Sequence, residues 1–148
     1  MALSDQLLNP NKKAEVVDDF CKLLDEEAAS KSGLSGLRIK SNLAAVKGIK
    51  PGYLGYAVEQ LLPGLCTVLD PIWSESVQKG DPVTHFVASR SRAADAILSV
   101  IDARIERVSN GIARGVYGQW RSEWDSSKRN VEEGIPGLAK LLKKHTLV

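Results

Sequence analysis

The sequence predicts an all-α fold, a helical bundle of about six helices plus short connecting helices, made from two divergent three-helix repeats. Apolar residues recur at the spacing of one helix face along most of the chain, and no stretch alternates apolar and polar residues as a half-buried strand does. Hydrophobic residues make up 43% of the 148 residues, which is enough material for one core. We therefore expect a single domain over 1–148, with repeat halves at about 12–74 and 89–148.

The first two helices are indicated by apolar periodicity and by the residues that end it. Residues 12–31 carry apolar side chains on one helical face, and Gly33 supplies a stop. A second helix is expected over about 35–49, with Ser35 as its N-cap and Pro51 beyond its end.

The third helix is expected to begin at Pro51 and to be bent or broken where Pro63 and Pro71 remove backbone donors. Asp81 and Pro82 then open a short connecting helix. The helices of the second half are expected at about 89–109, 112–120 and 126–145.

Two blocks of the first half recur in the second. The segment Val58–Asp70, VEQLLPGLCTVLD, reappears as Val131–Lys143, VEEGIPGLAKLLK, with six identities in thirteen positions. An earlier segment, Lys13–Asp25, aligns with Arg90–Asp102 and shares six apolar positions with it. Half a chain of this length has too little interior to be stable alone, so we expect the halves to share one core about a pseudo-twofold axis.

Bulk properties indicate a cytoplasmic protein without a membrane partner. No window approaches the roughly 18 apolar residues that span a bilayer, and no leader pattern is visible. Cys21 and Cys66 form no C-x-x-C pair, so reduced thiols are expected. Charge is spread evenly, with 8 basic and 9 acidic residues up to Ser74 and 12 and 9 afterwards. This asymmetry is too mild to indicate a nucleic-acid partner.

No catalytic, cofactor-binding or metal-binding residues are predicted. His85 and His145 have no ligand at metal-binding spacing on their own helix faces, and no nucleophile elbow or P-loop is present. The SKSGLSG segment from Ser30 to Gly36 looks like a phosphate cradle, but it follows a helix and is interpreted as a helix stop followed by an N-cap. The repeated aspartates are expected to be solvated or salt-bridged: Asp18, Asp25, Asp95 and Asp102.

A candidate interaction surface combines basic residues at seven-residue spacing with interleaved aromatic residues, a pattern that can bind nucleic acid or phosphorylated ligands. Three glycines at 111, 115 and 118 are expected to break the helix there, and neighbouring acids offset the charge. A solvated face and core packing of the aromatic residues are the competing interpretations. The candidate residues are Arg107, Arg114, Tyr117, Trp120, Arg121, Trp124 and Lys128.

Several segments together resemble a family of uncharacterised actinobacterial proteins, a domain of unknown function. They are SKSGLSG, AVKGIKPGY, LLPGL, VYG and NVEEGIPGLAKLLKKH. The resemblance covers essentially the whole chain and implies an all-helical cytoplasmic protein, but it implies no activity. The stretch QWRSEWDSS between VYG and NVEEG departs from the pattern, where a stretch richer in glycine and lysine is expected.

These observations favour a non-enzymatic helical protein that acts through protein–protein interaction, with an unknown protein partner or by self-association. One alternative is a small-molecule or lipid carrier with an apolar cavity between the halves. Another is nucleic-acid or phosphate binding through the Arg107–Lys128 region. An enzymatic function is the hypothesis that the sequence supports least.

Overall fold

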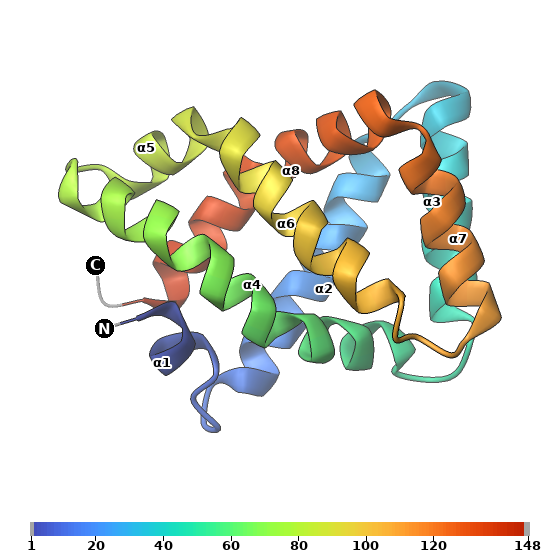
Figure 1. Cartoon of the computed structure of the whole chain (residues 1–148), viewed down its shortest axis with the longest axis horizontal. Coiled ribbons are helices and arrows are strands. Elements are labelled where there is room, and N and C mark those ends of the chain that lie inside the picture. The colour runs from blue at the N-terminus through green and yellow to red at the C-terminus, as the bar shows by residue number, and fades with distance from the viewer. Residues whose placement is uncertain (1, 147–148) are drawn as a thin grey trace.

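The computed structural model describes residues 2–146, apart from the side chain of Trp124. This part of the chain forms eight helices and no strand, which confirms the predicted all-helical fold class (Figure 1). The helices are α1 (Leu3–Leu7), α2 (Lys13–Ser30), α3 (Gly33–Lys47), α4 (Tyr53–Gln78), α5 (Pro82–Ala88), α6 (Arg90–Ile105), α7 (Gly111–Ser122) and α8 (Trp124–His145).

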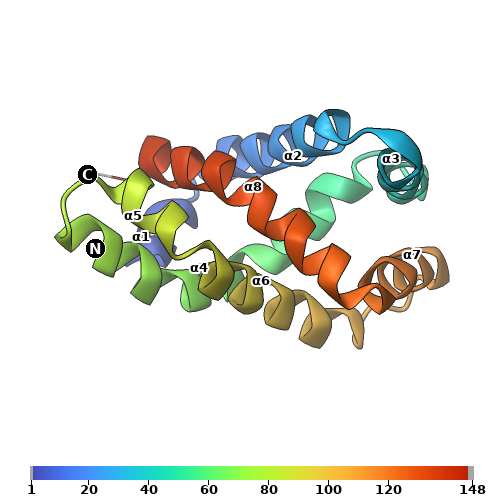
Figure 2. The same ribbon diagram turned by 90° about the horizontal axis from the view of Figure 1, so that it is seen from above.

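The helices form a two-sided arrangement with a distinct pair at each end. Figure 2 shows α2 along one side of the molecule and α6 along the other, with α4 and α8 crossing between the two sides. Helix α8 packs on α2, α5 and α6, and α4 packs on α6 and α2. Helices α3 and α7 contact each other at one end, whereas α1 and α5 lie at the opposite end with both termini (Figures 1 and 2).

One hydrophobic core joins all helices except the α3–α7 pair. Its largest fully buried side chains include Phe86, Leu62, Leu69 and Leu142, and the ring of Trp73 meets Phe86 edge-on at 5.5 Å. Within the described part of the chain, α3 and α7 contribute no residue to this cluster. The two helices are therefore attached outside the core.

Helix α4 runs unbroken through both internal prolines, so the predicted break does not occur. Pro63 and Pro71 are exposed, and each removes one hydrogen bond from the helix. The carbonyl groups that they release belong to Glu59 and Thr67, which are also exposed. Water can satisfy those acceptors, and the apolar face of α4 keeps the two proline-bounded parts packed on the core.

One helix start, that of α5, agrees with the prediction from the sequence, and another, that of α3, differs from it. Asp81 caps α5 as predicted, because its carboxylate accepts from the Thr84 hydroxyl at 2.8 Å and from the Thr84 backbone N–H. Ser35 is not an N-cap, since α3 begins at Gly33 with Ser32 in the capping position. The chain reaches this earlier start through a positive φ of 71° at Gly33, a conformation that glycine allows.

Two further boundaries were not anticipated. A short helix, α1, is held to α4 by the Leu3 backbone N–H, which donates to Asp70 Oδ1 at 2.8 Å. Helix α4 starts at Tyr53 instead of Pro51, because Gly52 adopts a left-handed φ of 76° and turns the chain just before the helix.

Helix α7 is continuous through its glycines, so the prediction that they break it is wrong. Asn110 caps its start, with its side-chain oxygen accepting from the Ala113 N–H at 3.0 Å. A β-carbon placed on Gly115 or Gly118 would meet no atom within 4 Å. Because α7 is continuous, residues three or four positions apart in it lie on the same helix face.

Two contacts recur at aligned positions of the predicted halves. A β-carbon on Gly64 of α4 would lie 3.0 Å from Val100 of α6, and one on Gly137 of α8 would overlap Leu23 of α2. The two glycines are aligned with each other in the repeat, as are Leu23 and Val100. The duplication itself stays a prediction. Close approaches at aligned positions are the contacts that we expect from two copies of one unit.

Candidate functional site

The sequence-predicted interaction residues do not form one surface. Tyr117 and Arg121 point inward across α7 to a single carboxylate on α6, that of Asp102. Arg121 Nε donates to Asp102 Oδ1 at 3.0 Å, Nη2 donates to Oδ2 at 3.2 Å, and the Tyr117 hydroxyl donates to Oδ1. Arg121 Nη1 also donates to the buried Ser127 hydroxyl at 3.1 Å. This network, which we call the Asp102 cluster, fastens α7 to α6 and α8.

The remaining predicted residues divide between packing and exposure. Lys128 donates to Asp95 at 3.1 Å and so joins α8 to α6. Trp120 is half-buried, with its ring 5.7 Å from that of Tyr117. Arg107 and Arg114 are exposed, and neither makes an ion pair within the described part of the chain. The predicted residue Trp124 begins α8, but its side chain lies outside the described residues.

The ionisation of the Asp102 cluster follows from its partial burial. Burial raises the pKa of Asp102, but hydrogen bonds from Arg121 and Tyr117 outweigh it and lower that pKa below 3.8. Burial, reinforced by the hydrogen bond to Asp102, raises the pKa of Tyr117 above its ordinary value. The cluster is therefore a fixed carboxylate held by two donors, which suits attachment of a helix better than proton transfer.

The large exposed apolar side chains concentrate on the two helices outside the core. Leu34 and Leu37 of α3 are 80% and 61% exposed, and Ile112 of α7 is 55% exposed. Leu37 falls within the helix expected over 35–49, but no exposed apolar face was predicted for that helix. The sequence does indicate which residues share this face, because Leu34, Leu37 and Ser41 lie three or four residues apart.

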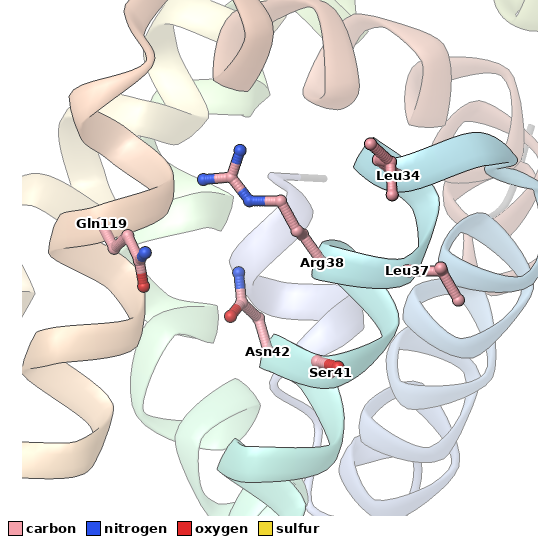
Figure 3. A pocket seen from close by; sticks show the side chains of 6 residues that line it. All are labelled: Leu34, Leu37, Arg38, Ser41, Asn42 and Gln119. Atoms are coloured by element: carbon pink, nitrogen blue, oxygen red, sulfur yellow. The ribbon is translucent and has the colours of Figure 1, made fainter.

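A groove lies between α3 and α7 beside these leucines. The groove has a volume of about 410 Å³ and is open to solvent. Figure 3 shows Arg38 and Asn42 of α3 reaching toward Gln119 of α7 across it. On α7, Ile112, Gly115 and Gln119 recur at a spacing that puts them on one face. The α3–α7 face is defined here as Leu34, Leu37, Arg38, Ser41, Asn42, Ile112, Gly115 and Gln119.

The two segments at this end of the molecule are basic, and acidic residues of adjoining segments pair with four of their eight basic residues within the described chain. The two segments that form this end, residues 28–58 and 107–122, contain eight basic residues and no acidic one, whereas the rest of the chain has 12 basic and 18 acidic residues. Neighbouring helices pair with part of this charge. Arg38 lies 2.8 Å from Glu123, and Lys47 pairs with Asp25 of α2. Lys40 and Arg114 are exposed and make no such pair within the described part of the chain.

A second polar cluster joins α2 to the end of α8. Its members Glu15, Asp19 and His145 are residue types that bind divalent cations, and their ligand atoms lie within 4.8 Å of one another. The Lys144 ammonium lies 2.8 Å from Asp19 and 3.6 Å from Glu15, so one cation already forms an ion pair with each carboxylate.

The geometry of this cluster is that of hydrogen bonding. His145 Nε2 and Asp19 Oδ2 are 2.6 Å apart, whereas two ligands of a tetrahedral zinc ion stand about 3.3 Å apart. The hydrogen bond from Lys144 lowers the pKa of Asp19, burial opposes the shift, and the hydrogen bond to His145 adds to it. The residues fit an ion-paired clasp between α2 and α8 better than a metal site.

Neither thiol has the surroundings of an activated nucleophile. Cys66 is buried, and burial raises its pKa to about 11. Burial likewise raises the pKa of Cys21, and the nearby Asp18 and Asp25 add to the effect. Both thiols are therefore protonated near neutral pH, as packing residues are.

Fold and surface together define an all-helical protein in which α3 and α7 lie outside the described core and expose apolar side chains. The chain belongs to the family of unknown function DUF6918, whose family model matches residues 3–146. No curated protein and no solved structure matches the chain. Within the described residues, no helix combines the length and apolarity needed to cross a bilayer.

Proposed function

We propose that this chain is a non-enzymatic binding protein that recognises another protein through the α3–α7 face. One observation carries the proposal: Leu34 and Leu37 are 80% and 61% exposed beside the groove, on a helix that contributes nothing to the described core. Fully burying a leucine or isoleucine side chain contributes roughly 1.5–3 kcal/mol, so covering this face is favourable. Contiguous exposed apolar side chains rimmed by polar groups are typical of interaction sites.

The carrier alternative has less support. The hollow of about 410 Å³ lies on the outer α3–α7 face, and a second hollow of about 400 Å³ lies over Asp102 and Tyr117. Both open to solvent, and neither lies in the core that the halves share. A lipid or drug-sized ligand normally has most of its surface buried in an enclosed site.

Nucleic-acid binding also has less support than protein binding. Two of the basic residues in the Arg107–Lys128 region, Arg121 and Lys128, are already engaged by carboxylates of α6. Arg107 and Arg114 alone give little of the phosphate neutralisation on which such binding depends. A cytoplasmic location and an actinobacterial origin stay predictions that belong to this proposal.

The proposal is tested on protein isolated under mild conditions from its native host, by size-exclusion chromatography with light scattering and mass spectrometry of the peak. Wild type is expected to travel with a protein partner, and the variant Leu34→Ser/Leu37→Ser without it. The matched control is Leu24→Ser, since Leu24 is a 41% exposed leucine of α2 outside the face.

Because all three leucines are exposed, each variant is expected to fold, and circular dichroism verifies this for each one. Retention of the partner by the double variant would overturn the α3–α7 face as the binding site. A co-purifying small molecule in place of a protein would favour the carrier alternative.

A further inference from the structure

We infer that α7 is a movable arm, which the Asp102 cluster holds bent at Glu123 and which straightens onto α8 as one continuous helix when the cluster opens. The straight helix would run from Gly111 to His145. Straightening would carry α7 away from α3 and so take apart the α3–α7 groove. The effect on partner binding rests on the proposed function, whereas the straightening itself does not.

The junction between α7 and α8 is a single residue. Helix α7 ends at Ser122, α8 begins at Trp124, and the two helices meet at a sharp bend (Figure 1). Glu123 makes this bend with a ψ of 77°, far from the helical value of about −40°. Rotation about one backbone bond is therefore the main difference between the bent form and a continuous helix.

A continuous helix would make backbone hydrogen bonds that the bent form lacks. The Ser127 N–H donates to the Glu123 carbonyl at 2.8 Å, and the three N–H groups before it receive no cap from the Glu123 side chain. In a straight helix these groups, of residues 124–126, would donate to the carbonyl groups of residues 120–122. Asp125 in the first turn of α8 favours a helix start, which is a smaller effect than three hydrogen bonds. Tertiary contacts must therefore hold the bend.

The aligned helices of the first half are joined differently. Five residues, 48–52, connect α3 to α4, and they include Gly48, Pro51 and Gly52. The repeat blocks are offset by 77 residues before this connection and by 73 after it, so the second half is four residues shorter there. Replacement of five residues by one accounts for that difference. The shortened junction contains no glycine or proline to stop a helix.

Side chains of other helices hold the bend in place. The Asp102 carboxylate of α6 accepts from Arg121 at 3.0 Å and also from the Tyr117 hydroxyl. Arg38 of α3 lies 2.8 Å from Glu123 itself. Straightening would carry Tyr117, six residues before Glu123, away from the carboxylate. The Asp102 cluster is therefore the latch of the bent form.

A second one-residue junction in the described chain lacks this freedom. Ser89 joins α5 to α6, and each of these helices buries a residue in the core, Phe86 and Ala93 respectively. Helix α7 contributes no residue to that core, so its position depends on the latch.

The connection before α7 is long enough for the movement. A straightened α7 would extend about 18 Å beyond Glu123. Helix α6 ends at Ile105, about one turn past Asp102, which contacts Arg121 beside the junction. The connection 106–110 spans about 20 Å when extended, so the start of α7 stays within its reach.

The inference is tested by pulsed electron spin resonance on the full chain, with spin-labelled non-natural amino acids in place of Arg114 and Lys140. Both positions are exposed, and neither belongs to the Asp102 cluster. A straight helix would separate the two positions by about 39 Å, and the bend brings them closer together. Circular dichroism verifies that each variant keeps its helices.

Wild type is expected to show the shorter separation. Asp102→Ala is expected to raise the ratio of straight to bent form about tenfold or more, because it removes hydrogen bonds to a charged group. Tyr117→Phe removes one donor and keeps the ring, so it should give a smaller rise. The matched control is Asp25→Ala, which removes the aligned aspartate of the first half and should leave the distances unchanged.

Two substitutions test the hinge itself in the Asp102→Ala background. Glu123→Ala and Glu123→Gly both remove the pair with Arg38 and differ in helix propensity. The alanine variant is expected to show a ratio of straight to bent form about fivefold higher than the glycine variant.

Equal ratios in the two hinge variants would overturn the inference, as would a broad spread of distances in place of the longer separation. An equal effect of Asp25→Ala would overturn the Asp102 cluster as the latch. If the longer separation never forms while Leu34→Ser/Leu37→Ser still loses its native partner, the inference falls and the proposed function stands. If that variant keeps its partner while the longer separation forms, the proposed function falls and the straightening stands.

Discussion

Replacing Asp102 by alanine should release α7 from the rest of the molecule. The Asp102 carboxylate accepts hydrogen bonds from Tyr117 and Arg121, and α7 has no residue in the described core to compensate for their loss. Hydrogen bonds to charged groups contribute roughly 1.5–3 kcal/mol each. Asp102 is 40% exposed, so solvent screens the interaction, and we expect a total loss of about 2 kcal/mol.

The aligned residue of the first half, Asp25, supplies the control. It pairs with Lys47 of α3, and both side chains are nearly half exposed, at 49% and 45%. Such surface pairs contribute about 0.2–1 kcal/mol, so Asp25→Ala should cost below about 1 kcal/mol. Both substitutions replace an aspartate near the end of a helix by alanine and gain similar helix propensity, so the difference between them isolates the Asp102 cluster.

Urea denaturation gives the two free energies of unfolding, and amide hydrogen exchange reports where protection is lost. Asp102→Ala should lower protection across 111–122 more than in α2, α4 and α8. Equal destabilisation by the two variants, or unchanged exchange in α7, would refute the assignment of the Asp102 cluster as the main attachment of this helix.

Two further predictions concern stability. Gly115→Ala should raise the free energy of unfolding by about 1 kcal/mol, since a β-carbon there meets no atom within 4 Å. Gly64→Ala should gain less stability or lose it, because its β-carbon would lie 3.0 Å from the Val100 side chain. Thermal melts compare the two variants. The pKa values of Asp19 and Asp102 are lowered in the fold, so the stability that they contribute is present above pH 4 or so and lost as pH falls further. Urea titrations between acidic and neutral pH should therefore show a flatter acid limb for Asp19→Asn/Asp102→Asn, and an unchanged limb would contradict the linkage.

The helices were predictable where local chemistry decides them. The apolar periodicity of 12–31 gave α2, and the Asp81 side chain followed by Pro82 gave the start of α5. Salt-bridged aspartates were also expected, and Asp95 and Asp102 each hold a basic residue of a later helix. Continuity of α4 was missed because it depends on which side of the helix Pro63 faces, a matter of tertiary packing.

The candidate site was harder to predict because it joins distant segments. The basic stripe from Arg107 onward was identified, but Arg121 turns inward to a carboxylate on another helix, which spacing along one segment cannot reveal. Counting charge by halves of the chain concealed the two basic segments, since residues 28–58 and 107–122 belong to different halves and meet only in the fold. The exposure of Leu34 likewise follows from α3 lying outside the core.

Photo-cross-linking tests most directly whether the α3–α7 face is the binding site. A photo-reactive amino acid in place of Leu37, which is exposed on α3, is compared in native-host cells with one in place of Lys140, which is exposed on α8. The account predicts a discrete protein adduct from position 37 and none from position 140. An adduct from position 140 alone, or from neither position, would contradict it.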